Sequence, residues 1–206
     1  MRARAAARGK SATIGVLALQ GAFREHCAAV RRLGHEAVEV RTPADLAGVD
    51  ALIIPGGEST TIDKLLDWQG LREPLQARLD AGMPTFGTCA GLIVLAASAV
   101  DGLPEQRPLA AIDIVAQRNG FGRQVRSFEA PVLLAGDDVP MTGVFIRAPR
   151  IVEVGDNVEI IATMGEEPVA AASGTIMVAT FHPELTDDDR LHRLFCERVA
   201  AIVQPI

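Results

Sequence analysis

The sequence predicts an α/β protein with a mostly parallel sheet and an antiparallel extension. Two observations lead to this fold class. In the first half of the chain, short apolar runs alternate with helical patterns, which is typical of βαβ units with right-handed crossovers. From residue 112 onward the apolar runs are separated only by turn residues such as Gly, Pro, Asp and Asn. Short apolar runs separated only by turns favour antiparallel strands.

The first half supplies the expected parallel strands and the helices between them. Apolar runs that end in glycine- or proline-containing turns predict strands at residues 13–19, 36–40, 51–54 and 84–86. Helical periodicity predicts helices at 22–33, 60–68 and 71–81, followed by an apolar helix after residue 89. In the first helix, Phe23, Cys27 and Val30 share one face.

The second half predicts seven short strands and a closing helix. The strands are expected at 112–116, 124–134, 143–146, 151–154, 158–163, 169–172 and 176–181. They either extend the edge of the sheet or fold as a flap over it. Thr186, followed by three aspartates, predicts the N-cap of the last helix. The apolar face of that helix comprises Leu191, Leu194, Phe195, Val199 and Ile202.

Composition indicates one soluble domain, residues 13–206, preceded by a disordered basic tail, residues 1–12. The 206 residues are 49% apolar, which suffices for a core, and contain no run long enough to span a membrane. The tail carries Arg2, Arg4, Arg8 and Lys10 without an acid, so the rest of the chain has 16 basic and 26 acidic residues. This acidic body argues against general nucleic-acid binding. A targeting peptide or a polyanion-binding arm is the alternative interpretation of the tail.

The cysteines indicate a reduced, cytoplasmic chain. Cys27, Cys89 and Cys196 are odd in number and lack metal-ligand spacing. Cys27 and Cys196 lie in helical patterns, and we expect both to be packing residues.

Cys89 is the candidate nucleophile. Gly87-Thr88-Cys89-Ala90-Gly91 joins a short strand to an apolar helix, in the pattern of a nucleophile elbow with cysteine in place of serine. The two glycines permit a cramped turn, and the helix N-terminus favours the thiolate. The Ala90 N–H is placed to help hold an oxyanion. The alternative is an ordinary buried cysteine.

His182 is the candidate general base, with Glu184 as its orienting acceptor. His182 follows an apolar strand, and an extended backbone would turn residues 182 and 184 to the same side. Pro183 favours that extended conformation. His26 and His192 lie in charged helical contexts and His35 lies in a turn, so we expect all three to be solvated. A surface turn with an incidental histidine, or a metal site of His182, Glu184 and His192, is the weaker alternative.

A glycine loop is expected to complete the site. Pro55-Gly56-Gly57-Glu58-Ser59-Thr60 ends a strand but lacks the terminal G-K-[ST] of a phosphate loop. Adjacent glycines let a backbone N–H approach a ligand closely, so the N–H near Gly57 is the expected second oxyanion donor. A plain structural turn is the alternative.

These motifs together resemble the class I (triad) glutamine amidotransferases, and more closely the glutaminase subunits of pyridoxal 5′-phosphate synthases. The resemblance spans residues 13–203. It rests on LQG with REH (residues 19–21 and 24–26), PGGESTT (55–61), FGTCAGL (86–92), RNGFGRQ (118–124), FIRAP (145–149) and FHPEL (181–185). The Cys and H-P-E elements are general among amidotransferases, whereas PGGEST, RNGFGRQ and FIRAP are narrower.

The resemblance implies a flavodoxin-like doubly wound fold and a glutaminase that hydrolyses L-glutamine to glutamate and ammonia. It implies Cys89, His182 and Glu184 as the catalytic triad. The implied glutamine-binding residues are Gly57, Glu58, Ser59, Arg118, Ile146 and Arg147. It also implies delivery of ammonia to a partner protein, the synthase subunit, with no metal or cofactor on this chain. Gly120 departs from the expected serine or alanine, which would loosen its loop.

Three other functions are compatible with the sequence. The chain could be the glutaminase of another pathway, a cysteine hydrolase or stress protein of similar fold, or a non-catalytic interaction subunit. The H-P-E sequence argues against the second, since such a hydrolase does not need it. The intact set of Cys89, His182 and Glu184 argues against the third.

Overall fold

The centre of the molecule is a nine-stranded sheet whose first half is parallel. The computed structural model describes residues 12–102, 106–118, 120–121 and 127–203. The parallel strands lie in the order β2-β1-β3-β4-β12, and each pairs in parallel with its neighbours. Their bounds are β1 Thr13–Leu17, β2 Glu36–Val40, β3 Ala51–Ile54, β4 Thr85–Thr88 and β12 Ile176–Ala179. This is the flavodoxin-like order, which confirms the predicted fold class.

The other half of the sheet is antiparallel and continues from β12. Its strands are β11 Glu167–Ser173, β10 Glu159–Met164, β7 Ser127–Leu134 and β8 Met141–Ile146. A separate three-stranded sheet contains β5 Ala96–Ala99, β6 Ile112–Gln117 and β9 Arg150–Val154. The second half of the chain therefore both extends the large sheet and forms a smaller one. The predicted start of β7 at residue 124 lies outside the described residues.

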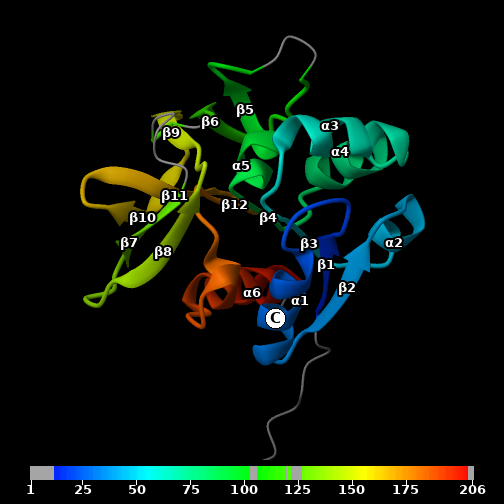
Figure 1. Cartoon of the computed structure of the whole chain (residues 1–206). Helices are drawn as coiled ribbons and strands as arrows, with labels where there is room; N and C mark the ends of the chain where they lie inside the picture. Colours follow the sequence, from blue (N-terminus) through cyan, green and yellow to red (C-terminus); the bar gives the residue numbers. More distant parts are fainter. Residues whose placement is uncertain (1–11, 103–105, 119, 122–126, 204–206) are drawn as a thin grey trace, which may run out of the picture.

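Helices cover both faces of the large sheet. They are α1 Phe23–Arg32, α2 Pro43–Ala47, α3 Ser59–Trp68, α4 Arg72–Asp80, α5 Ala90–Leu95 and α6 Arg190–Val203, with a 3₁₀ turn η1 at Pro183–Leu185. Helices α1 and α6 lie on one face, and α3, α4 and α5 lie on the other (Figure 1). The arrangement is doubly wound. Within the described residues no helix combines the length and the apolar character needed to cross a membrane.

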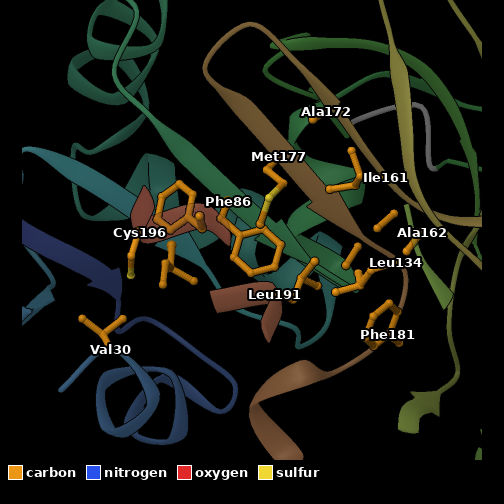
Figure 2. Close-up of a cluster of buried hydrophobic side chains, with 14 of the residues drawn as sticks. Val30, Phe86, Leu134, Ile161, Ala162, Ala172, Met177, Phe181, Leu191 and Cys196 are labelled. Carbon is orange, nitrogen blue, oxygen red and sulfur yellow. The ribbon is translucent and has the colours of Figure 1, made fainter. Parts of the chain in front are cut away.

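Each face of the sheet has its own apolar core. Figure 2 shows the core beneath α1 and α6, which includes Val30, Phe86 and Leu191. Cys27 and Cys196 are buried in this core, as predicted. Burial raises the pKa of the Cys196 thiol to about 12, so this cysteine stays protonated at neutral pH. The second core packs α2 to α5 against the opposite face.

The last helix begins later than the sequence predicts. Thr186 does not cap it, because the Thr186 hydroxyl donates to the Pro183 carbonyl and accepts the Asp188 N–H within a turn. The helix starts at Arg190, whose N–H donates to the Asp188 carboxylate at 3.1 Å. Ile202, expected on the buried face, is 44% exposed in the final turn, although the predicted stripe is buried or half-buried up to Val199.

Ala12 belongs to the folded body rather than to the predicted tail. It is buried at the start of β1, and the next residue, Thr13, donates its N–H to Asp50 at 2.8 Å. The rest of the predicted tail, residues 1–11, lies outside the described part of the chain.

Candidate active site

Cys89 lies in a strained turn between β4 and α5. Its φ is 49°, a conformation that residues with a side chain rarely adopt. The turn is cramped because α5 packs directly on the strands: a Cβ on Gly91 would lie 2.1 Å from the Ile54 carbonyl oxygen, and one on Gly87 would lie 2.6 Å from the Gly91 oxygen. The glycines of the predicted elbow thus allow the close packing that holds Cys89 at the edge of the sheet.

The carboxyl ends of neighbouring parallel strands bring the candidate residues together. Strand β4 leads into Cys89, and the adjacent β12 leads toward His182, with Thr88 paired to Ala179. The predicted juxtaposition of these two strand ends is therefore confirmed. Strands β1 and β3 end beside them in loops that carry Gly21 and Gly56. These loops touch, since a Cβ on Gly21 would lie 1.7 Å from the Gly56 oxygen.

His182 and Glu184 meet as expected, but by a different backbone path. His182 Nδ1 lies 2.8 Å from Glu184 Oε1, and the carboxylate is buried. The prediction of an extended backbone is wrong, because Pro183 begins the 3₁₀ turn η1 and Glu184 lies within it. Proline suits the first position of a helical turn, where no N–H is needed. The tight turn, not an extended strand, brings the carboxylate back to the ring.

The surroundings of His182 favour its protonated form. Burial alone would lower its pKa, but hydrogen bonds with Cys89 and Glu184 outweigh burial and raise the pKa to about 10. For Glu184, burial would raise the pKa, but His26 and His182 outweigh it and hold the pKa below its ordinary value. At neutral pH the site therefore holds an imidazolium between the Glu184 carboxylate and the Cys89 sulfur.

Gly56 leaves the space that His182 occupies. A Cβ at residue 56 would lie 2.3 Å from His182 Cε1 and 3.2 Å from Cys89 Cβ. We expect Gly56→Ala to push the ring away from the sulfur and to slow alkylation of Cys89 by iodoacetamide at neutral pH by about 10-fold or more, because the imidazolium no longer supports the thiolate.

The matched control for this prediction is Gly48→Ala, whose Cβ would meet its nearest atom, the Asp45 oxygen, at an ordinary 3.5 Å. That variant should be alkylated at the wild-type rate. An equal rate in Gly56→Ala would show that the alanine methyl does not displace His182.

A cavity of about 360 Å³ opens in front of Cys89 and His182. It is lined by the other residues expected to bind substrate or an oxyanion: Gly57, Glu58, Ser59, Ala90, Arg118, Ile146 and Arg147. Glu184 lies behind His182, outside the lining. Sequence reasoning missed Gln20, Gly21, Ile93 and Pro149 as lining residues. The position of Gln20 and Gly21 just beyond the first strand was the available signal.

Glu58 has two roles in the structure, of which the sequence indicated only the one in the cavity. Its carboxylate caps α3 by accepting the N–H groups of Thr60 and Thr61. Burial would raise the pKa of Glu58, but the bonds from these threonines keep the pKa below its ordinary value. The same carboxylate accepts from Arg118 at 3.1 Å, and the Glu58 N–H donates to Gln20 Oε1 at 2.9 Å. Glu58 is therefore an ionised, rigidly held acceptor at the cavity wall.

Two further cavity groups are available to a ligand. The Ser59 hydroxyl is buried and has no hydrogen-bond partner among the described residues. The Ile146 carbonyl oxygen lies 3.8 Å from the Cys89 sulfur.

Arg147, with a φ of 45°, follows Ile146 in a second strained turn at the cavity. Arg118 is described, but much of the loop after it, residues 119 and 122–126, is not.

The structure gives a physical reason for Gly120. A Cβ at this position would lie 2.4 Å from Arg150 Cγ, so the Arg150 side chain occupies the space that a serine or alanine would need. Arg150 is itself held by an ion pair with Glu167 and lies over the Phe121 ring. The Gly120 N–H donates to Ala148 at 3.1 Å.

The prediction of solvated histidines is wrong for His26 and His192. Both are fully buried, on the inner faces of α1 and α6, and they contact each other. Their charged sequence neighbours point away from this face. His35 is half-buried in the turn before β2. In the part of the chain that the structure describes, no cluster of His, Cys, Asp and Glu side chains could hold a metal ion.

Comparison with known proteins points to one family. The model of the SNO glutamine amidotransferase family matches residues 16–201. The pyridoxal 5′-phosphate synthase subunit PdxT of Salinispora tropica is 50% identical over 196 residues, which cover 92% of this chain and 98% of that protein. The PdxT subunit of Acidothermus cellulolyticus is 54% identical over 194 residues, covering 91% and 94%.

Solved structures agree with the fold. A crystal structure described as a glutamine amidotransferase superposes with a TM-score of 0.85 at 49% identity, covering 91% of this chain and 98% of that one. A glutamine amidotransferase from Thermotoga maritima has a TM-score of 0.59 at 12% identity, covering 95% and 97%. The second likeness concerns the fold alone.

Proposed function

The chain belongs to the SNO glutamine amidotransferase family and is a glutaminase, and we propose that it hydrolyses L-glutamine through a triad of Cys89, His182 and Glu184. We further propose that the released ammonia passes to a synthase subunit that makes pyridoxal 5′-phosphate. One observation supports the triad most directly. The buried Glu184 carboxylate, the His182 imidazolium and Cys89 in its strained elbow contact one another in sequence at the edge of one substrate-sized cavity.

In the first half of the proposed reaction, the Cys89 thiolate attacks the side-chain amide carbon of glutamine. The developing oxyanion accepts hydrogen bonds from the N–H groups of Ala90 and Gly57. Ala90 is the first residue of α5, so its N–H has no acceptor within the helix. The His182 imidazolium gives its proton to the departing nitrogen, ammonia leaves, and a glutamyl thioester remains on Cys89.

In the second half, neutral His182 takes a proton from water, and the hydroxide attacks the thioester carbon. The carbon–sulfur bond breaks, glutamate leaves, and the thiolate–imidazolium pair is restored. Glu184 accepts the Nδ1–H of His182 throughout, which keeps Nε2 directed at the reacting atoms. Its buried position supports this orienting role.

The charges of the cavity suit free glutamine. The ionised Glu58 carboxylate and the Ile146 carbonyl oxygen offer acceptors for the α-ammonium group. The guanidinium groups of Arg118 and Arg147 offer donors for the α-carboxylate. The unpartnered Ser59 hydroxyl adds one donor or acceptor. These groups would fix the amino-acid end of glutamine, leaving the amide to reach Cys89.

The test of the proposed function couples the chain to its partner. The chain is combined with a pyridoxal 5′-phosphate synthase subunit, its phosphosugar substrates and L-glutamine, without ammonium salt. We expect formation of glutamate and of pyridoxal 5′-phosphate, whereas the isolated synthase subunit should need added ammonium. If ammonium supports product formation but glutamine with this chain does not, the proposed ammonia delivery is wrong.

A further inference from the structure

A second row of buried polar groups lies behind the proposed triad. His26 Nε2, on α1, lies 3.3 Å from Glu184 Oε2 and 3.2 Å from Thr88 Oγ1. His26 Nδ1 lies 2.9 Å from His192 Nε2, on α6. Neither histidine lines the cavity, and both are 0% exposed. The triad reaction as described uses neither of them.

Glu184 needs a second donor, and His26 offers it. Oε1 of the carboxylate accepts from His182, whereas Oε2 accepts no hydrogen bond of ordinary geometry within the described residues. A buried carboxylate with one unmatched oxygen is costly, by about 1–3 kcal/mol. The ring nitrogen of His26 faces that oxygen at 3.3 Å, within the range of an ion pair or a long hydrogen bond.

The contacts favour one proton arrangement along the row. If His26 Nδ1 carried the proton and donated to His192, the bare lone pair of Nε2 would face the Glu184 carboxylate, which is repulsive. If His192 Nε2–H donates to His26 Nδ1, the His26 proton lies on Nε2, which is 3.2 Å from Thr88 Oγ1 and 3.3 Å from Glu184 Oε2. His192 Nδ1 is then a lone pair, and no donor to it is found among the described residues.

We propose that His26 is a positioning residue: as a neutral imidazole with its proton on Nε2, it holds the Glu184 carboxylate ionised and turned toward His182. His192 fixes the tautomer of His26 by donating to its Nδ1. This inference rests on the proposed triad and extends it by two residues.

The local charges agree with neutral rings. Burial lowers the pKa of His26 below its ordinary value, although Glu184 opposes the shift. Burial also lowers the pKa of His192, to about 3. The charged and titratable groups that face the pair are Glu25, Arg32, His182, Glu184 and Asp189. Near neutral pH, therefore, His26 faces Glu184 Oε2 at 3.3 Å with a neutral N–H rather than as a cation.

The test replaces His26 with glutamine, asparagine and leucine in the otherwise complete chain, assayed with the synthase subunit. The glutamine amide nitrogen is as many bonds from the backbone as Nε2, whereas the asparagine nitrogen corresponds to Nδ1. We expect His26→Gln to stay within about 3-fold of wild-type kcat. We expect His26→Asn and His26→Leu to lose about 10- to 100-fold in kcat with little change in KM. That is the size of loss typical when the residue that orients a metal ligand is removed.

The pH profile separates positioning from packing. In the asparagine and leucine variants, the alkaline fall in kcat/KM that reports the His182 imidazolium should move to lower pH by about one unit, because Glu184 then supports the imidazolium less well. His35→Leu, at a half-buried histidine outside the site, should change neither kcat nor the profile. Thr88→Val should lower kcat far less than His26→Leu.

Three results would overturn the inference. They are an unchanged kcat and pH profile in His26→Leu, equal losses in the glutamine and asparagine variants, and a Thr88→Val variant that reproduces His26→Leu. If the leucine variant does not fold, the contrast between glutamine and asparagine decides. An active Cys89→Ala enzyme would instead refute the triad itself, so failure of this inference can be told from failure of the proposed function.

Discussion

Cys89→Ala should lower glutaminase turnover by at least ~10³-fold, because the thioester cannot form without the sulfur. The variant should fold normally. Alanine keeps the same Cβ, and the elbow that holds residue 89 at a φ of 49° is built by the packing of Gly87 and Gly91 rather than by the sulfur. The measurement is glutamate released from L-glutamine in the presence of the synthase subunit.

Cys196→Ala is the matched control for this prediction. Cys196 is buried in the core beneath α6, and its thiol makes no contribution to the cavity. The control should keep turnover within about 3-fold of wild type and lose about 1 kcal/mol of stability through reduced packing. A Cys89→Ala enzyme that retains a tenth of wild-type turnover would contradict the assignment of the nucleophile.

His182→Asn should lower kcat by about 10²- to 10⁴-fold, the range that general acid–base catalysis contributes. Asparagine can accept or donate one hydrogen bond, but it cannot carry the proton that the departing ammonia needs. The alkylation rate of Cys89 at neutral pH should fall in the same variant, because the imidazolium that supports the thiolate is gone.

The pH profile of the wild-type enzyme provides a second readout of His182. The folded-state pKa of His182 is raised to about 10, so the imidazolium persists below that pH and is lost above it. Activity of the wild type should therefore fall as pH rises through about 10, and the residual activity of His182→Asn should show no such step. An alkaline limb that survives in the asparagine variant would assign the step to another group.

The sequence predicted the parallel half of the fold well because each signal there is local. Strands β2 and β3 match their predicted bounds, and the strands that carry Cys89 and His182 lie side by side as expected. Helix α2 and strand β5 were missed, because each is only a few residues long and buries little. For α2 the sequence did offer a usable signal. Thr42 and Asp45 form a capping box, and Pro43, between them, opens the first turn.

The two buried histidines show where inference from neighbouring residues in the sequence failed. His26 and His192 stand beside charged residues along the chain, but each faces inward once its helix packs on the sheet. For His192 the periodicity was available, because residues 192, 195, 196 and 199 form one helical stripe that is buried throughout. The contacts of His26 with Glu184 and with His192, however, depend on how α1, α6 and η1 pack together. Only the three-dimensional packing determines that contact.

The most direct test of the account is the detection of the glutamyl thioester. The enzyme and its synthase partner are mixed with L-glutamine and quenched in acid at successive times, and the peptide that contains Cys89 is examined by mass spectrometry. We expect a transient adduct with the mass of one glutamyl group on Cys89, formed before glutamate accumulates and absent from Cys89→Ala. Glutamate production that leaves Cys89 unmodified at every time point, and that continues in Cys89→Ala, would contradict it.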